Sequence, residues 1–343
     1  MTLKVYREAI PQDEARKIEV FLKTHPADTI FQSPAFHHFY LGLLHYHPWY
    51  FVIFNAKNDV SAVLLAVIIS EGGGLMARVS SRCVVYGGPI INADDPSLLA
   101  LLLASLNKNI KHRAIFTQFR NFRIWNETAT SIFLGHGFEL RDRLNLIVSL
   151  KSKEAVLAGF SASRRRQLKK AFASEIVIRP AKNLKEVRIL FQLLFKLYRN
   201  KVKKPLPPLS FFEQFFMKLA ASGHGVILLV LYENEIIGGI VSPVTPAHTI
   251  SELYVCGLDR EYPNIYPSVA ATWAALEYGL NNGIRYFDFM GLGKPDVPYG
   301  VRDFKLRFGG DQVNYGRFAR RNSKVLYAIA EFGYNVLRSF KKI

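Results

Sequence analysis

The sequence is poor in cysteine and, for its length, in acidic residues. Cys83 and Cys256 are the only cysteines among 343 residues, too few for a disulfide framework or a four-thiolate zinc site. We therefore expect two buried thiols in a reducing compartment, with the cytoplasm as the default. The chain has 45 Lys and Arg but only 27 Asp and Glu, which gives a formal net charge of +18. This excess favours a polyanionic partner such as nucleic acid, a phosphorylated lipid or a nucleotide-carried substrate.

Long apolar runs and metal-ligand patterns are also missing. The longest apolar run, residues 60–69, falls short of the roughly 20 residues of a membrane-spanning helix. The first ten residues lack the apolar core of a signal peptide. The histidine-rich stretch 37–47 has no Cys or acid at ligand spacing. The sequence thus predicts a chain that does not cross a bilayer and that has no metal site.

Core-forming residues, by contrast, are plentiful. The chain is 50% hydrophobic and 13% aromatic, which excludes a disordered chain and suffices for two domains. The first 150 residues alternate between helical and strand patterns, so we expect an α/β domain with mixed sheets over 1–150, closed by a strand at 145–150. Its other expected elements are helices at 13–24, 33–44 and 96–109 and strands at 49–54, 60–70, 76–85 and 114–119.

The second half repeats this alternation over residues 151–314. Pro267 and Gly283 stand where a helix start and a helix stop are expected. The order of elements is that of an acyltransferase fold of the GNAT type, so we predict two tandem GNAT-like α/β domains followed by a C-terminal segment, 315–343. The expected elements are strands at 175–179, 225–233, 235–243, 249–257 and 286–290 and helices at 184–201, 211–222 and 267–282.

One region carries a family signature. The run YFDFMGLG at 286–293 is followed by DFKLRFGG at 303–310. This pair resembles the signature of the Fem peptidoglycan-bridge aminoacyltransferases and their FemAB-like relatives, in which YDFxG precedes FKxxFGG. Four further matches, FQSP at 31–34, YGGP at 86–89, GF at 137–138 and SRRRQLKKA at 163–171, extend the resemblance over nearly the whole chain.

The resemblance implies a tandem GNAT protein that moves an activated acyl group, usually from aminoacyl-tRNA, to an amine of a lipid- or nucleotide-linked cell-wall precursor. No cofactor besides the donor is implied, and the enzyme would work in the cytoplasm or peripherally at the inner face of the membrane. The sequence departs from the best-known Fem enzymes in one respect. Only two ordinary helices lie between Pro180 and Gly223, so the long helical hairpin arm is missing and contact with tRNA cannot be assigned to it.

Lys305 and Asp288 are the candidate catalytic residues. An amine that attacks an ester must lose a proton, and the tetrahedral intermediate carries a negative oxygen. Lys305, flanked by Phe304 and Leu306, is expected to stabilise that oxygen; otherwise it is a solvated surface lysine. Asp288 lies in an apolar strand, where an ionised carboxylate needs a partner. It is expected to orient or deprotonate the amine, or else to bond loop amides or Arg302 as a structural carboxylate.

A dense basic group opens the second half. Arg165 and Lys169, and likewise Arg166 and Lys170, share a helix face at a spacing of four residues. We expect this group to bind a diphosphate or the tRNA backbone, or else to form a solvated basic helix. The residues assigned to phosphate are Arg164, Arg165, Arg166, Lys169 and Arg302.

The segment 258–267 bears on the donor. Acyl-CoA-dependent GNAT proteins carry a glycine-rich junction here, whose backbone N–H groups bind the pyrophosphate. This chain has no glycine after Gly257 and carries two acids instead, which argues against CoA. Tyr254, Tyr262 and Tyr266 are expected either to line the acceptor or donor channel or to pack with an exposed hydroxyl.

The C-terminal residues 323–340 have apolar residues at helical spacing. This basic amphipathic helix is expected to rest on an anionic membrane surface or to pack on the first domain. The apolar positions are Val325, Leu326, Ile329, Phe332, Val336, Leu337 and Phe340.

Three functions therefore remain open. The first is aminoacyl transfer to a cell-wall or envelope precursor, with its site in a cleft between the domains. The second is acyl-CoA-dependent N-acyl transfer in exopolysaccharide or lipid biosynthesis. The third is a non-catalytic GNAT-like protein that binds RNA or anionic membrane through its positive charge.

Overall fold

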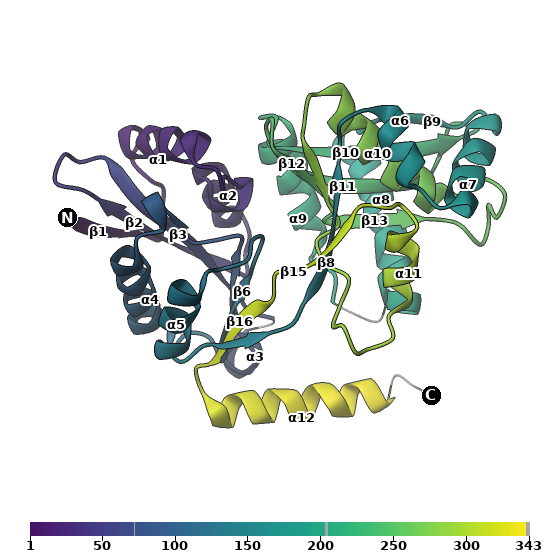
Figure 1. Cartoon of the computed structure of the whole chain (residues 1–343). Coiled ribbons are helices and arrows are strands. Elements are labelled where there is room, and N and C mark those ends of the chain that lie inside the picture. Colours follow the sequence, from purple (N-terminus) through teal and green to yellow (C-terminus); the bar gives the residue numbers. More distant parts are fainter. Residues whose placement is uncertain (72, 203–204, 341–343) are drawn as a thin grey trace. The chain divides into compact units, whose positions relative to one another are not determined.

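The computed structural model describes residues 1–71, 73–202 and 205–340, and the chain forms two compact units (Figure 1). The first unit joins Met1–Asp142 to the segment that begins at Tyr315. The second unit is Arg143–Asn314. The chain therefore leaves the first unit once and returns to it, so that the first unit is built from two separate stretches of sequence.

The first unit is built on a mixed sheet with the strand order β1-β2-β3-β4-β6-β16-β7, to which β5 adds on β3. Strands β4 and β6 are parallel, and the other pairs are antiparallel. The strands are β1 (Thr2–Tyr6), β2 (Tyr46–Phe54), β3 (Val60–Ile69), β4 (Arg82–Tyr86), β5 (Ile90–Ile91), β6 (Phe116–Arg120), β7 (Glu139–Arg141) and β16 (Arg317–Arg321).

Helices cover both faces of this sheet over β2 and β3 (Figure 1). Side chains of α4 and α5 form one core cluster with Phe51, Val85, Phe119 and Phe318, and α1 and α2 lie on the other side. Because Ser33, Asp95 and Asn126 accept from first-turn N–H groups, they fix where α2, α4 and α5 begin. The helices are α1 (Gln12–Thr24), α2 (Pro34–Leu41), α3 (Gly74–Ser80), α4 (Pro96–Ile110), α5 (Glu127–Gly135) and α12 (Lys324–Phe340), with 3₁₀ turns at Ile30–Gln32 and Asn92–Asp94.

The second unit has its own mixed sheet, in the order β15-β8-β14-β12-β11-β10-β9, with β13 added on β11. Only β12 and β14 pair in parallel among the described strands of this sheet. The strands are β8 (Leu144–Ser149), β9 (Val177–Pro180), β10 (Gly225–Tyr232), β11 (Glu235–Thr245), β12 (Thr249–Ser251), β13 (Tyr254–Gly257), β14 (Tyr286–Asp288) and β15 (Asp311–Asn314).

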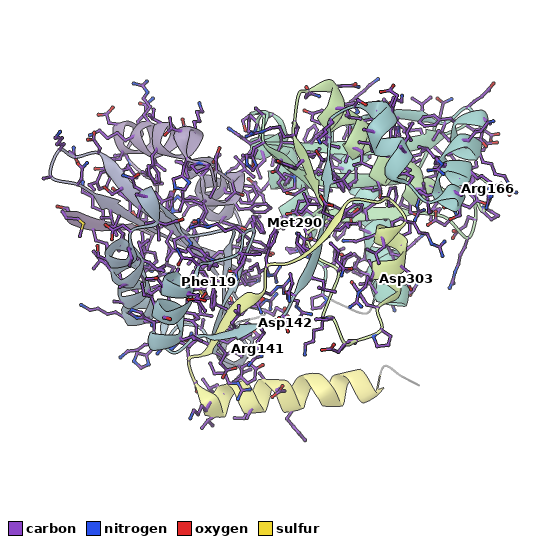
Figure 2. The ribbon with its side chains drawn as sticks, viewed as in Figure 1. Phe119, Arg141, Asp142, Arg166, Met290 and Asp303 are labelled. Carbon is purple, nitrogen blue, oxygen red and sulfur yellow. The ribbon has the colours of Figure 1, made fainter. Side chains whose placement is uncertain are left out.

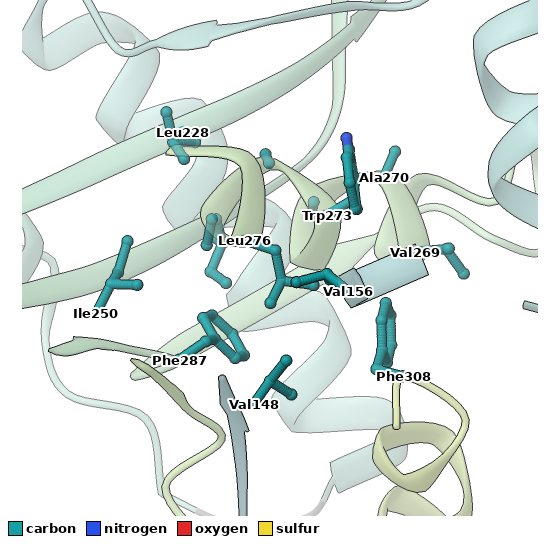
Figure 3. Packing of buried hydrophobic residues seen from close by; sticks show 14 of the residues in the cluster. Val148, Val156, Leu228, Ile250, Val269, Ala270, Trp273, Leu276, Phe287 and Phe308 are labelled. Atoms are coloured by element: carbon teal, nitrogen blue, oxygen red, sulfur yellow. The ribbon is translucent and has the colours of Figure 1, made fainter. Parts of the chain in front are cut away.

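Helix α10 is the centre of the second core. Ten of its residues are buried, among them Val269, Trp273 and Leu276, and Figure 3 shows these side chains in one cluster with Phe287 and Phe308. This burial explains the almost continuous apolar sequence of the helix. The helices of this unit are α6 (Lys153–Gly159), α7 (Ala162–Ala173), α8 (Leu184–Leu197), α9 (Leu209–Gln214), α10 (Pro267–Asn281) and α11 (Gly300–Leu306), with π turns at Tyr198–Val202 and Phe215–Ala220.

The predicted fold class, α/β with two tandem domains and mixed sheets, is confirmed. The strand expected to close the first domain lies in the second sheet instead: β8 pairs with β14 and β15. Leu146 and Val148 of β8 enter the second core, which accounts for this placement. The chain therefore passes into the second unit after Asp142, upstream of the expected boundary at residue 150.

Two smaller expectations also change. Residues 76–85, expected as one strand, are helix α3 followed by β4. Ser80 is the last residue of that helix, and its hydroxyl accepts from the N–H of Glu71 and donates to the carbonyl of Glu71. The side chains of Val336, Leu337 and Phe340, expected on the apolar face of the C-terminal helix, lie outside the described residues. Among the residues described, no helix is long and apolar enough to span a bilayer.

Candidate functional site

The second sheet opens between two strands. The expected strand 249–257 is two strands, β12 and β13, and only β12 pairs with β14, over Thr249–Ser251. Beyond Ser251, β13 is paired with β11 alone in the part of the chain that the structure describes. The last bond across the gap runs from the N–H of Glu252 to the carbonyl of Asp288, at 2.8 Å. The two strands therefore separate at Glu252 and Asp288.

Helix α11 brings Lys305 to this opening. The residue is buried, 8% exposed, and its Nζ forms an ion pair with Glu252 Oε1 at 2.9 Å. The same Nζ donates to the carbonyls of Phe289, at 2.6 Å, and Gly291, at 3.3 Å. Three acceptors match the three N–H bonds of the ammonium group. Lys305 is thus a buried, positioned cation and not a solvated surface lysine.

Asp288 is buried directly beside this ion pair. Its Oδ1 accepts from Asn145 Nδ2 at 2.7 Å and from the N–H of Met290 at 2.6 Å. Burial raises the pKa of Asp288, these two bonds and the charge of Lys305 oppose the shift, and the charge of Glu252 adds to it. A carboxylate whose pKa is raised is a stronger base, and this suits it to accept a proton as a general base.

Glu252 belongs to this site, and the sequence analysis missed it. It is 5% exposed, and its Oε2 has no hydrogen-bond partner among the described residues. Burial raises the pKa of Tyr198, and the charge of Glu252 contributes to that rise. Glu252 is the only acid in the apolar run 249–257, so the argument used for Asp288 also singles it out.

The basic group of α7 divides into two sets. Arg164 is buried between the rings of Phe304 and Phe308, with its Cζ 4.4 and 4.2 Å from their centroids. It donates to the Phe304 carbonyl at 2.7 Å, next to Lys305. Burial, with the nearby charge of Arg307, lowers its pKa to about 10. Arg164 therefore fastens α7 to the helix that carries Lys305.

The other members of the group lie elsewhere. Arg165 donates to carbonyls at the end of α6, the shortest bond being 2.5 Å to Phe160. Arg166 and Lys169 are exposed, and Figure 2 shows Arg166 at the outer edge of α7. Lys170 is exposed as well, so the outer face of α7 carries three cations.

Arg302 acts on the loop that follows the signature strand. Its guanidinium donates to the carbonyls of Leu292, at 3.0 Å, and Pro295, at 3.0 Å, and also to those of Lys294 and Val297. Asp288 accepts from the N–H of Met290 in this loop, as expected for a structural carboxylate. None of the hydrogen bonds of Arg302 given above goes to Asp288. The contact of Arg302 with phosphate stays a prediction.

Of the three candidate tyrosines, the structure brings one to the opening. Tyr254, two residues from Glu252, packs with Phe212 at 5.3 Å between ring centroids and with Tyr198 at 6.1 Å. Tyr262 packs on Tyr232 at 5.8 Å. Tyr266 precedes α10 with φ of 54°, and both Tyr262 and Tyr266 border the core. Their role in a substrate channel stays a prediction.

The N-terminus of α10 is occupied by a side chain of this protein. Asp259 Oδ1 accepts from the N–H of Ser268 at 3.0 Å. Gly257 approaches the same turn so closely that a Cβ there would lie 2.2 Å from the Ser268 nitrogen. Backbone N–H groups at a helix start are the usual anchor for a pyrophosphate. In this chain the carboxylate of Asp259 takes that place and repels a second anion.

No metal cluster accompanies these groups in the described ranges: no three His, Cys, Asp or Glu residues are placed to hold an ion. His37 of the histidine-rich stretch is buried and stacks on Tyr50, with 5.6 Å between ring centroids. Burial, with the charge of His38, lowers the pKa of His37 to about 4. It is therefore a neutral core residue at physiological pH.

Comparisons with known proteins bear on this fold. None of the curated protein sequences matches the chain, but residues 159–306 match the family model described as an acetyltransferase (GNAT) domain. The structure of FemX is similar with a TM-score of 0.72 at 13% identity, covering 96% of this chain and 99% of that one. A domain of a protein assigned as lysylphosphatidylglycerol synthetase from Agrobacterium fabrum has a TM-score of 0.55 at 12% identity, covering 95% and 96%.

A third similar structure is a tandem GNAT protein from the clavulanic acid biosynthesis pathway, with a TM-score of 0.58 at 11% identity, covering 94% of this chain and 99% of that one. Identities this low show the fold. The chain thus has the FemAB-like tandem GNAT fold that its motifs indicated. The family match over the second unit supports an acyltransferase.

Proposed function

We propose that this protein is an N-acyltransferase that moves an aminoacyl group from aminoacyl-tRNA to an amine of a cell-wall or envelope precursor. The observation that carries the proposal is the buried Lys305–Glu252 pair beside Asp288, at the point where the second sheet opens. The names of two similar proteins, FemX and a lysylphosphatidylglycerol synthetase, support aminoacyl transfer. The net charge of +18 suits a polyanionic donor.

Each charged group has a distinct role in the proposed reaction. The amine nitrogen attacks the ester carbonyl, the new C–N bond forms, and the ester C–O bond breaks as the donor hydroxyl leaves. Asp288 takes the proton that the amine loses and passes it to the leaving oxygen, so that the donor is released with its hydroxyl restored. Lys305 exchanges its long bond to Gly291, 3.3 Å, for the negative oxygen of the tetrahedral intermediate. Glu252 holds the ammonium group in place meanwhile.

The exposed face of α7 is the proposed contact for phosphate. Arg166 and Lys169, together with Lys170, are exposed, and like charges crowded on one helix favour binding of an anion. Arg164, Arg165 and Arg302 donate to backbone carbonyls instead. Their contribution to substrate binding is proposed to be indirect, through the position of α11 and its preceding loop.

A transfer assay tests this function. The full chain is mixed with bulk tRNA charged with labelled amino acids and with an extract of lipid-linked wall precursors. We expect label in the lipid fraction, lost after RNase treatment and lost with Lys305→Met. Lys294→Met, an exposed lysine in the loop before α11, is the matched control and should transfer normally. Absence of transfer by the wild type, while a known enzyme works in the same extract, would overturn the proposal.

An acyl-CoA donor is the second candidate, since the matching family model describes an acetyltransferase domain over 159–306. The carboxylate of Asp259 at the start of α10 opposes it. Titration calorimetry with CoA separates the two donors. Saturable CoA binding that competes with the aminoacyl donor would favour the acyl-CoA reaction.

A further inference from the structure

Helix α12 carries an apolar stripe that faces outward. Val325, Ile329 and Phe332 are 70%, 53% and 72% exposed, and Ala328 between them is exposed too. The spacing of three and four residues puts all four side chains on one face of the helix. A helix that covers a core would direct this face inward. The apolar stripe, defined by these four residues, therefore needs a partner outside the first unit.

The opposite face of the helix already has its partner. Leu326, Tyr327 and Ala330 are half-buried, and α12 contacts α3. The ring of Tyr327 meets Phe116 of β6 edge-on, with 5.9 Å between centroids. Ser323 caps the first turn by accepting from the N–H of Leu326 at 3.3 Å. The helix is thus held on the first unit without any contribution from the apolar stripe.

Two cations lie at the N-terminal end of the apolar stripe. Lys324 starts the helix, Arg321 precedes it, and both are exposed; Arg321 lies over the ring of Tyr327, 4.9 Å from its centroid. Glu331 is the only acid in the helix. An apolar face with bordering cations, on a chain of net charge +18, is complementary to a surface that is anionic outside and apolar just beneath. A bilayer of anionic lipids is such a surface.

We propose that α12 is a membrane-binding helix, which lies in the plane of an anionic bilayer with the apolar stripe inserted at the boundary between headgroups and acyl chains. Arg321 and Lys324 contact the lipid headgroups. This binding is independent of the proposed acyl transfer and holds whichever donor the second unit uses. It would concentrate the protein where lipid-linked acceptors lie.

Vesicle sedimentation with the full chain tests the proposal. We expect affinity about thirtyfold higher for vesicles of phosphatidylcholine with phosphatidylglycerol than for pure phosphatidylcholine, as two basic residues near an anionic surface imply. The double variant Ile329→Glu with Phe332→Glu should lose about tenfold or more of the binding to anionic vesicles. The control is Ile124→Glu, at an isoleucine that is 72% exposed, as Phe332 is, elsewhere on the first unit. It should bind as the wild type does.

Insertion itself has a separate readout. Cys83 and Cys256 are buried, so a Phe332→Cys variant can be labelled selectively with an environment-sensitive fluorophore. Anionic vesicles should shift its emission to the blue, while the same label at an Ile124→Cys variant should not respond.

Three results would overturn the proposal. Equal loss of vesicle binding in the double variant and the Ile124→Glu control, or no loss in either, would mean that the apolar stripe does not carry the binding. Conversion of a wild-type dimer to a monomer by the double variant, in light scattering without vesicles, would assign the apolar stripe to a second copy. A lower unfolding midpoint of the double variant without vesicles, relative to the control, would assign it to the chain's own packing.

Discussion

At the residue scale, the Lys305–Glu252 pair combines a structural and a chemical role. Both residues are at most 8% exposed, and removal of one member of a buried pair leaves the other charge uncompensated. Stability and activity can still be separated, because a variant that removes both charges has no uncompensated ion.

We predict that Lys305→Met lowers the free energy of unfolding by about 3–5 kcal/mol, and that the double variant Lys305→Met with Glu252→Gln recovers most of this loss. Neither variant should transfer. Urea unfolding of the two singles, the double and Lys294→Met measures the coupling. Transfer by the double variant would show that Lys305 does not stabilise the intermediate.

Asp288 gives a prediction about pH. Its pKa is raised by burial in the folded protein and returns to about 3.8 on unfolding. The folded state therefore binds more protons than the unfolded state between these two values, and stability falls as pH rises through that window. The difference in unfolding free energy between the wild type and Asp288→Asn should change in this window and be constant above it. A difference in unfolding free energy that does not change with pH would contradict a raised pKa of Asp288.

The two catalytic candidates were found from the sequence because both lie in one linear signature. Glu252 was not, because its role depends on the strand 249–257 dividing after Ser251, and strand patterns alone do not show where two strands part. The burial of Arg164 is equally invisible in the sequence. Neighbouring arginines have the same helix propensity. Only the packing of α7 against Phe304 and Phe308 distinguishes Arg164 from the others.

At the scale of elements, α7 should respond differently to two neighbouring substitutions. Arg164→Ala removes a charge-assisted bond to the Phe304 carbonyl, 2.7 Å, and should lower the unfolding free energy by about 1.5–3 kcal/mol. Arg166→Ala, on the exposed face of the same helix, should change it by no more than about 0.5 kcal/mol. Urea unfolding compares them directly. Equal destabilisation would mean that Arg164 does not fasten α7 to α11.

The start of α10 gives a prediction about the donor. Because the carboxylate of Asp259 bonds the N–H of Ser268, the wild type should not bind CoA measurably in calorimetry. Asp259→Asn keeps an acceptor for the N–H but removes the negative charge, so it should bind CoA more tightly than the wild type if charge is the barrier. Tight binding by the wild type would show that the loop admits pyrophosphate despite Asp259.

At the scale of the whole molecule, the sequence predicted the fold class and most elements correctly, because amphipathic periodicity is a local property. It did not predict that β8 joins the second sheet or that β16 returns to the first sheet. The alternation of Leu144–Ser149 suits either sheet, and only the partners of Leu146 and Val148 in the second core decide between them. Residues 315–323 likewise showed no sign of joining a sheet formed almost two hundred positions earlier, where Phe318 is opposite Phe119.

This return strand yields the last prediction. Strand β16 lies between β6 and β7, and Phe318 is fully buried, stacked on Phe133 at 4.0 Å. A chain that ends at Ser323 lacks only α12 and should keep amide protection in β6, whereas a chain that ends at Asn314 should lose it. Hydrogen exchange measures both.

Point substitutions separate this role of β16 from the effect of shortening the chain. Phe318→Ala should cost about 3–5 kcal/mol of unfolding free energy, because it opens a cavity among packed rings. Phe332→Ala, at a position 72% exposed, should cost less than about 0.5 kcal/mol. Equal protection of β6 in the two truncated chains would mean that the first unit is complete without its C-terminal strand. We expect the reverse, since loss of β16 leaves the inner edge of β6 unpaired and the ring of Phe133 without its stacking partner.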